Sequence, residues 1–331
     1  MSDPVADALL ETMRAQRPDD DLRYEVEPTP MTGGYFAAIL QFRLASPPDD
    51  LRGDLVARII PIPEVWARES AIQAYVAGAG FPTPAVRMSV DATSPLGRGL
   101  IVMDRATGSS PLSGLGPADI FRQLPSIVAG LPRTLARVSE RLHSLDPSPL
   151  DAALDDVGGD LPRTPREFVE RLADNATGTG HHFLAEAAEG LADTEPPMSA
   201  PVVCHGDLHP FNLLVDGDRV MLIDWTNSRI ADPTFDLAFT HLMLTEMPVD
   251  VPKVARVALG PVARSLGRRF LREYTALRGS PIDQPAFDWH RRVHALRILV
   301  EVAGLTTVGP RSDDHPFMAM APKMRTVLGL G

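Results

Sequence analysis

The residues best suited to chemistry lie in one short segment and in a carboxylate that follows it. Residues 205–212 read HGDLHPFN and contain Asp207 and Asn212, and Asp224 comes after an apolar run. Transfer of a phosphoryl group from a metal-bound nucleotide needs a group that orients or deprotonates the attacking hydroxyl, and oxygen ligands for Mg²⁺. A carboxylate, an amide and a second carboxylate supply these groups. The residue types therefore indicate phosphoryl transfer.

The sequence between Asn212 and Asp224 predicts a β-hairpin. Two short apolar runs flank an Asp-Gly pair at residues 216–217, which is a typical hairpin signal. An antiparallel return would bring Asp224 back beside Asn212, with Asp207 nearby in the preceding loop. We therefore expect Asn212 and Asp224 to bind one Mg²⁺ ion, and Asp207 to orient or deprotonate a substrate hydroxyl.

The stretch VVCHGDLHPFNLLVDGDRVMLIDW resembles the catalytic segment of the aminoglycoside phosphotransferase-like family. Members show H-G-D-x-x-x-x-N followed by I-D-W or I-D-F, and residues 231–238 (ADPTFDLA) are also similar to the family pattern. The resemblance implies a small-molecule kinase of the aminoglycoside phosphotransferase and choline kinase type. It also implies that Asp236 braces the backbone of the catalytic loop. His205 is expected to hold the loop in shape by hydrogen bonding.

The resemblance implies an α+β, two-lobed, protein-kinase-like fold. Residues 1–105 would form a small, antiparallel, β-rich lobe that covers the nucleotide. Residues 106–331 would form a larger, mainly helical lobe with the catalytic loop and the acceptor cleft.

The expected first lobe contains a Gly-Gly pair between two predicted strands, residues 23–27 and 36–44. The backbone N–H groups of Gly33 and Gly34 could lie over the nucleotide phosphates. Gly-Gly is also an ordinary hairpin turn, and the small polar residues that usually follow these glycines in the family are missing here.

The basic residue expected to contact the phosphates is an arginine. Residues 54–60 (DLVARII) read as a strand that carries Arg58, and no lysine occurs in the expected first lobe. Arginine can bind two phosphate oxygens at once. The kinase pattern implies that Glu69, in a predicted helix that opens at Arg68, is the partner of Arg58. A surface arginine and a glutamate favoured at a helix N-terminus are the ordinary alternatives.

The unbroken apolar run of residues 99–104 predicts a buried strand that leads into a hinge. The fold resemblance implies that backbone groups from Asp104 to Ala106 bind adenine there.

The remaining sequence is mainly helical. Residues 131–145 and 286–303 are predicted helices, and Thr164-Pro165-Arg166-Glu167 has the pattern of a capping box. Residues 148–163 and 190–200 are rich in Pro, Asp and Gly and are predicted to be surface loops.

Composition limits the class of protein. The chain has 331 residues, 44% of them hydrophobic, with one cysteine and a formal net charge of −11. These values indicate a globular protein without a disulfide framework and suit a reducing cytoplasm. The sequence predicts no signal peptide or membrane span, and the acidic charge argues against a nucleic-acid or anionic-membrane partner. It weakly favours a cationic substrate.

The sequence therefore predicts a Mg²⁺-dependent phosphotransferase that moves the γ-phosphoryl group of ATP or GTP to a hydroxyl of a small molecule. One alternative is a non-catalytic nucleotide- or ligand-binding protein on the same fold. A metallohydrolase using His205, Asp207 and His209 is a formal rival, because these residues alternate as strand-borne ligands would. The motif does not identify the acceptor, and aminoglycosides, macrolides, other sugars, choline-like amines and hydroxyacyl compounds all stay open.

Overall fold

The computed structural model describes residues 4–31, 37–113, 117–157, 162–246, 253–308 and 315–330. The chain forms two compact units, and each consists of several segments. The first unit comprises Met1–Ser109, Ser148–Leu161 and Leu213–Ser228. The second comprises Ser110–Pro147, Pro162–Asn212 and Arg229–Gly331.

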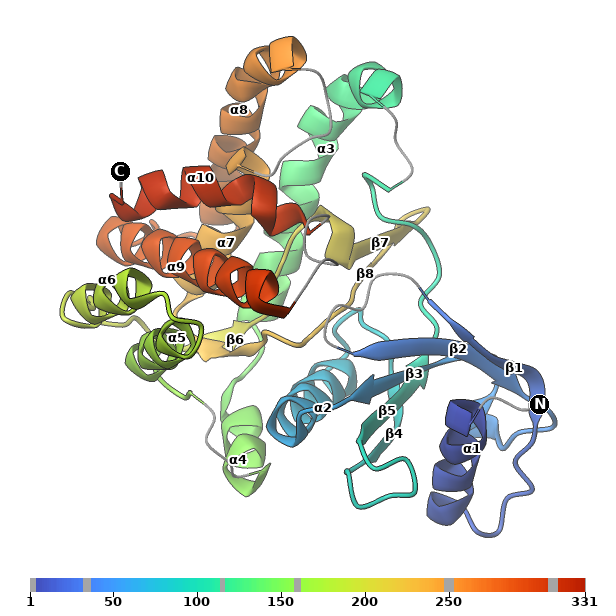
Figure 1. Ribbon diagram of the computed structural model, residues 1–331. Coiled ribbons are helices and arrows are strands. Elements are labelled where there is room, and N and C mark those ends of the chain that lie inside the picture. The colour runs from blue at the N-terminus through green and yellow to red at the C-terminus, as the bar shows by residue number, and fades with distance from the viewer. Residues whose placement is uncertain are drawn as a thin grey trace. The chain divides into compact units, whose positions relative to one another are not determined.

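The first unit is built on an antiparallel sheet with the strand order β1-β2-β3-β5-β4 (Figure 1). Its strands are β1 (Tyr24–Pro30), β2 (Ala38–Leu44), β3 (Asp54–Ile60), β4 (Val86–Val90) and β5 (Gly99–Asp104). The predicted bounds of β3 and β5 are confirmed. In the central strand β3, Arg58 is paired with Ile39 on one side and with Ile101 on the other.

Helices cover both faces of this sheet. From α1 (Pro4–Gln16), Leu9 and Met13 pack with Leu55 of β3. From α2 (Pro63–Gly78), Trp66 packs on the opposite face, where Arg58 also lies by strand alternation. A short 3₁₀ helix, η1 (Asp49–Leu51), precedes β3, and α4 (Ser148–Val157) packs against α2.

A two-stranded hairpin, β7 (Leu213–Asp216) and β8 (Arg219–Leu222), also belongs to the first unit. Leu213 pairs with Leu222 at its open end, and Gly217 has the positive φ of 58° that its tight turn requires. The predicted hairpin is confirmed. It is followed by Trp225, which is fully buried and donates a hydrogen bond from Nε1 to Thr83 Oγ1 at 2.8 Å.

The second unit is mainly helical. Its helices are α3 (Pro117–His143), α5 (Pro165–Gly178), α6 (His182–Ala192), α7 (Pro233–Glu246), α8 (Lys253–Arg278), α9 (Gln284–Val308) and α10 (Pro316–Leu328). A short strand pair, β6 (Val202–Cys204) with β9 (Arg229–Ala231), and a 3₁₀ helix, η2 (Pro210–Asn212), lie at the predicted catalytic segment. Apolar side chains of α5, α6, α7, α9 and α10 form the core with β6.

Several predicted boundaries were wrong. Only residues 131–143 of the predicted helix 131–145 are helical, as the last part of α3, which begins at Pro117 and contains Pro132 in its interior. Residues 148–163 were predicted to be a loop, but α4 occupies 148–157 because Leu150 and Leu154 are buried. Helix α2 begins at Pro63, so Glu69 lies in its interior and not at its N-terminus.

Other predictions are confirmed. Thr164 caps α5 by accepting a hydrogen bond from the backbone N–H of Glu167, whose side chain accepts one from the backbone N–H of Thr164. The α+β class is also confirmed, with an antiparallel sheet in one unit and a helical second unit. The placing of a lobe boundary at residues 105 and 106 stays a prediction.

Candidate functional site in two clusters

The backbone of the predicted catalytic loop is held by Asp236, at the start of α7. Its carboxylate accepts hydrogen bonds from the backbone N–H of His205 at 2.8 Å and from that of Gly206 at 2.6 Å. Gly206 has a φ of 73°, a left-handed conformation that glycine adopts without strain. The backbone on the N-terminal side of Asp207 is therefore fixed by a side chain that is itself fully buried.

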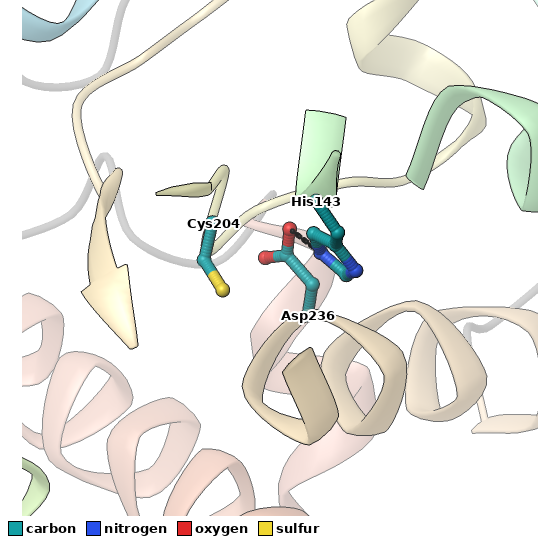
Figure 2. A group of neighbouring side chains, drawn as sticks. All are labelled: His143, Cys204 and Asp236. Atoms are coloured by element: carbon teal, nitrogen blue, oxygen red, sulfur yellow. Dashed lines mark hydrogen bonds and ion pairs between the residues drawn. The ribbon is translucent and has the colours of Figure 1, made fainter. Parts of the chain in front are cut away.

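Asp236 belongs to a buried hydrogen-bond network (Figure 2). His143 Nε2 lies 3.2 Å from Asp236 Oδ2, and His143 Nδ1 lies 2.8 Å from the hydroxyl of Tyr274. Burial raises the pKa of Asp236, but the hydrogen bond with His143 and neighbouring positive charge outweigh it and hold this pKa below its usual range. The carboxylate thus remains the acceptor that the loop backbone needs.

Within the described residues, His143, Cys204 and Asp236 place ligand-type atoms within 4.8 Å of one another. Figure 2 shows the three side chains. Both ring nitrogens of His143 have partners, and Cys204 Sγ lies 3.5 Å from the carbonyl oxygen of Asp232, so the arrangement fits a structural network better than a metal centre. Burial raises the pKa of the Cys204 thiol, which keeps it protonated.

Both carboxylate oxygens of Asp207 are held within the second unit. Arg297 donates from Nη2 to Oδ1 at 2.9 Å, and Asn212 donates from Nδ2 to Oδ2 at 3.2 Å. His209 Nε2 lies 3.5 Å from Oδ2. Burial raises the pKa of Asp207, but the His209 contact and the Arg297 charge outweigh it and hold this pKa well below its usual range. The side chain is therefore a carboxylate with a fixed orientation.

Asn212 ends η2 and is tied to Asp207. Its Nδ2 also donates to the backbone carbonyl oxygen of Asp207 at 2.9 Å. Because both of these bonds use the amide nitrogen, the amide oxygen is not used in them. An amide oxygen is a suitable ligand for Mg²⁺.

The second cluster lies in the first unit and surrounds Arg58. Arg58 Nε lies 2.7 Å from Glu69 Oε1, and Arg58 Nη2 donates to Asp224 Oδ1 at 3.0 Å. Thr226 joins the group, because its hydroxyl lies 2.5 Å from Arg58 Nη2 and 2.7 Å from Asp224 Oδ1. Arg58 is only 7% exposed and Glu69 is 1% exposed. Arg58 is thus a buried arginine between two carboxylates, which excludes a surface role.

Asp224 has an unusual backbone. Its φ is 69°, in the left-handed region that few residues other than glycine adopt, although Asp is among the more tolerant. Its side chain is 33% exposed, and its carboxylate can supply the oxygen ligands that Mg²⁺ prefers. Strained backbone of this kind is often found at functional sites.

Burial has a strong effect on Glu69. It raises the pKa of Glu69 to about 7, while the charge of Arg58 acts in the opposite direction. A buried carboxylate is stable as an anion only beside a cation. Glu69 and Arg58 therefore depend on each other.

The remaining predicted nucleotide contacts lie in the first unit. Asp104 ends β5, where its side chain binds Arg87 at 2.6 Å and its backbone N–H donates to the carbonyl oxygen of Ala85. Ala106 follows in the segment after β5. Gly33 and Gly34 lie outside the described residues. Adenine binding at Asp104 and Ala106, and phosphate binding at the glycines, stay predictions.

Sequence reasoning missed Thr226. It placed Arg297 and Glu301 on a polar stripe of the helix predicted at residues 286–303, lining the acceptor cleft or facing solvent, and it missed the bond of Arg297 to Asp207. Thr226 follows the I-D-W motif directly, so a hydroxyl two residues after Asp224 was the available signal. Arg297 and Glu301 have the i, i+4 spacing of an ion pair on a helix. Nothing in their spacing indicates a bond to Asp207, which lies 90 residues earlier in the chain.

The metal site of the rival metallohydrolase hypothesis is not formed by the described residues. In the described part of the chain, His143, Cys204 and Asp236 are the group close enough to share an ion, and His205, Asp207 and His209 are not gathered in this way.

The sequence pattern described as the phosphotransferase enzyme family matches residues 48–291, and this chain belongs to that family. The matched range includes both clusters apart from Arg297 and Glu301. The predicted family is confirmed.

Similar proteins agree with this assignment. An aminoglycoside 3'-phosphotransferase of Streptomyces ribosidificus is 38% identical over 125 residues, which are 35% of this chain and 44% of that protein. The match thus spans less than half of that relative's length.

Solved structures share the fold. A candidate aminoglycoside phosphotransferase from Ralstonia eutropha JMP134 has a TM-score of 0.65 at 18% identity, covering 97% of this chain and 96% of that one. A spectinomycin phosphotransferase in complex with ADP and spectinomycin has a TM-score of 0.57 at 14% identity, covering 98% and 97%.

Among the helices of the described residues, none combines the length and apolarity that a membrane crossing requires.

Proposed function

We propose that this protein is a small-molecule kinase that transfers the γ-phosphoryl group of ATP or GTP to a hydroxyl group, with Mg²⁺ as cofactor. The observation that carries this proposal is the carboxylate of Asp207, which is held at both oxygens in a loop braced by Asp236. Phosphoryl transfer depends on such positioning more than on covalent chemistry by the protein.

Asp207 is the catalytic residue of this proposal. The acceptor oxygen forms a bond to the γ-phosphorus, the bond from that phosphorus to the β,γ-bridging oxygen breaks, and the nucleoside diphosphate leaves. The carboxylate of Asp207 orients the acceptor hydroxyl and receives its proton as the new bond forms.

Asn212 and Asp224 are the proposed Mg²⁺ ligands. They flank the open end of the β7–β8 hairpin in sequence, where Leu213 pairs with Leu222, and they offer an amide and a carboxylate oxygen. A bound Mg²⁺ ion neutralises negative charge on the nucleotide phosphates. His205 and Asp236 support the loop that presents Asp207.

We assign binding of the nucleotide, the phosphate donor, to residues of the first unit. Arg58, held by Glu69, contacts the nucleotide phosphates, the backbone N–H groups of Gly33 and Gly34 are further proposed phosphate contacts, and backbone groups of Asp104 and Ala106 bind adenine. The support is the burial of Arg58 between two carboxylates, and the ADP bound by a spectinomycin phosphotransferase of the same fold.

The acceptor is a small hydroxyl-bearing compound. The net charge of −11 favours a cationic one, and neither a nucleic acid nor a membrane is expected as a partner. We place the reaction in the cytoplasm, where ATP is available and a lone buried thiol stays reduced.

The test is a phosphorylation screen of aminoglycosides, macrolides, sugars, choline-like amines and hydroxyacyl compounds with Mg·ATP and Mg·GTP. Asp207→Asn serves as the inactive control. We expect at least one phosphorylated product from the wild type and none from the variant. Equal product from both proteins would contradict the proposal.

A non-catalytic binding protein on the same fold is the second candidate. The ion pair between Arg58 and Asp224 favours it, because this pair occupies a proposed metal ligand. Mg²⁺-dependent binding of ATP without a phosphorylated product from the whole panel would support this candidate over the kinase.

A further inference from the structure

Arg297, on α9, is a buried arginine whose three donor groups all have partners in the second unit. It is 3% exposed, and its Nη1 donates to the backbone carbonyl oxygen of Gly206 at 2.6 Å. Its Nη2 donates to Asp207 Oδ1 at 2.9 Å, and its Nε donates to Glu301 Oε1 at 2.7 Å. One guanidinium thus holds both the backbone before Asp207 and the Asp207 side chain.

The planar shape of the guanidinium matters here. It presents its donors in a rigid fork, which a lysine ammonium cannot reproduce. With Oδ1 of Asp207 bound to Arg297 and Oδ2 bound to Asn212, neither rotation nor tilting of the carboxylate is possible without breaking a hydrogen bond. Glu301 neutralises the guanidinium and limits its movement from the next turn of the same helix.

We propose that Arg297 is a positioning residue, which fixes the carboxylate of Asp207 in the orientation that receives the acceptor hydroxyl, and that Glu301 holds Arg297 in place. This inference rests on the proposed function and adds two residues to it. Both lie outside the range matched by the family pattern.

Helix α9 has several anchors besides Arg297. Trp289 Nε1 donates to the carbonyl oxygen of Leu191 at 3.0 Å, and His294 Nε2 lies 2.8 Å from the carbonyl oxygen of Phe235. Apolar side chains such as Leu296 and Val300 also bury this helix in the core. Buried ion pairs are expensive to desolvate, and an apolar residue of similar size often stabilises a fold equally well. The burial of Arg297 therefore points to a role beyond packing.

The test compares Arg297→Met, Arg297→Lys and Glu301→Gln with Arg292→Met, which removes an exposed arginine from the same helix. For each, kcat and KM are measured with Mg·ATP and the acceptor found in the screen, and Mg·ADP affinity is measured by calorimetry. Because small misplacements of catalytic groups are costly, Arg297→Met should lower kcat by about 10- to 100-fold.

The pattern of effects separates positioning from structure. We expect Arg297→Met to change the KM for Mg·ATP and the Mg·ADP affinity by less than about two-fold, Arg297→Lys to recover part of kcat, and Arg292→Met to match the wild type. Glu301→Gln keeps the guanidinium and should lower kcat less, so it gives an answer even where Arg297→Met does not fold.

Three results would overturn the inference. The first is an unchanged kcat in a folded Arg297→Met variant. The second is an unchanged kcat in Glu301→Gln when Arg297→Met does not fold. The third is a parallel loss of kcat and of Mg·ADP affinity in Arg297→Met. A wild type that binds Mg·ADP but transfers no phosphoryl group has a different meaning, because it contradicts the proposed function and the inference together.

Discussion

The two units contain clusters of the same design. In each, a buried arginine pairs with a helix glutamate and with an aspartate of the predicted catalytic segment. In the first unit Arg58 lies between Glu69 and Asp224, and in the second unit Arg297 lies between Glu301 and Asp207. Charge and burial alone therefore do not distinguish the roles of these two arginines.

The two aspartates differ in how they are held. Asp207 accepts hydrogen bonds at both oxygens, and its loop is fixed by Asp236. Asp224 has a strained left-handed backbone and a side chain 33% exposed, against 17% for Asp207. One cluster thus holds a carboxylate in a single orientation, whereas in the other Asp224 is a third exposed and paired with Arg58. Under the proposed function, Mg²⁺ would replace Arg58 at Asp224, and the nucleotide phosphates would replace Asp224 at Arg58.

The largest effect is expected from Arg58→Met. It leaves Glu69 buried without its cation, which should lower the free energy of unfolding by about 3–5 kcal/mol and weaken Mg·ATP binding by at least about 10-fold. Chemical denaturation and calorimetry measure the two effects. Arg58→Met with Glu69→Gln should regain much of the stability but not the affinity. Unchanged Mg·ATP affinity would show that Arg58 does not contact the nucleotide phosphates.

A smaller effect is expected from low pH, which should lower the stability of the second unit. His290, on α9, is 1% exposed, and burial lowers its pKa to about 4, with Asp232 raising it and Arg229 lowering it. Its folded pKa lies below the unfolded value, so the unfolded chain binds more protons and stability is lost as pH falls from about 6.5 to 4.

This loss should reach about 2–3 kcal/mol at pH 4, as measured by denaturation at a series of pH values. His290→Gln should reduce the dependence in this window without abolishing it, because burial also lowers the pKa values of His241 and His294. As pH is lowered, the backbone amides of α9 should lose their protection from hydrogen exchange before those of β3 do. An unchanged pH profile in His290→Gln would show that another group is responsible.

The smallest effect is expected from Thr164→Ala, which removes the N-cap of α5. It should lower the free energy of unfolding by about 1 kcal/mol without changing kcat or Mg·ADP affinity. This variant is also the control for Arg297→Met, because it separates loss of stability from loss of turnover. A fall in kcat after this substitution would mean that turnover follows the stability of the whole unit.

What the sequence could predict was mostly local. The hairpin, the capping box and strand β3 follow from turn residues, caps and apolar runs that lie within a few residues of each other. Pairing of Arg58 with Glu69 was predictable because the family resemblance supplies their order.

What it could not predict depends on tertiary contacts. The predicted helix start at residue 131 was wrong, because α3 runs from Pro117 through Pro132. Residues 148–157 of the predicted loop form α4, because packing overrides composition there. The bond between Arg297 and Asp207 joins residues far apart in sequence. The i, i+4 spacing of Arg297 and Glu301 predicts an ion pair on one helix, but it does not predict which distant residue Arg297 also binds.

The most direct test of the central claim is a paired calorimetric and kinetic comparison of Asp207→Asn with Asp224→Asn. The account predicts that Asp207→Asn binds Mg·ADP with wild-type affinity but loses at least about 100-fold in kcat, the scale of a lost acid–base group. Asp224→Asn should lose the Mg²⁺ dependence of ADP binding. Wild-type turnover in Asp207→Asn, or wild-type Mg²⁺ dependence in Asp224→Asn, would contradict the account.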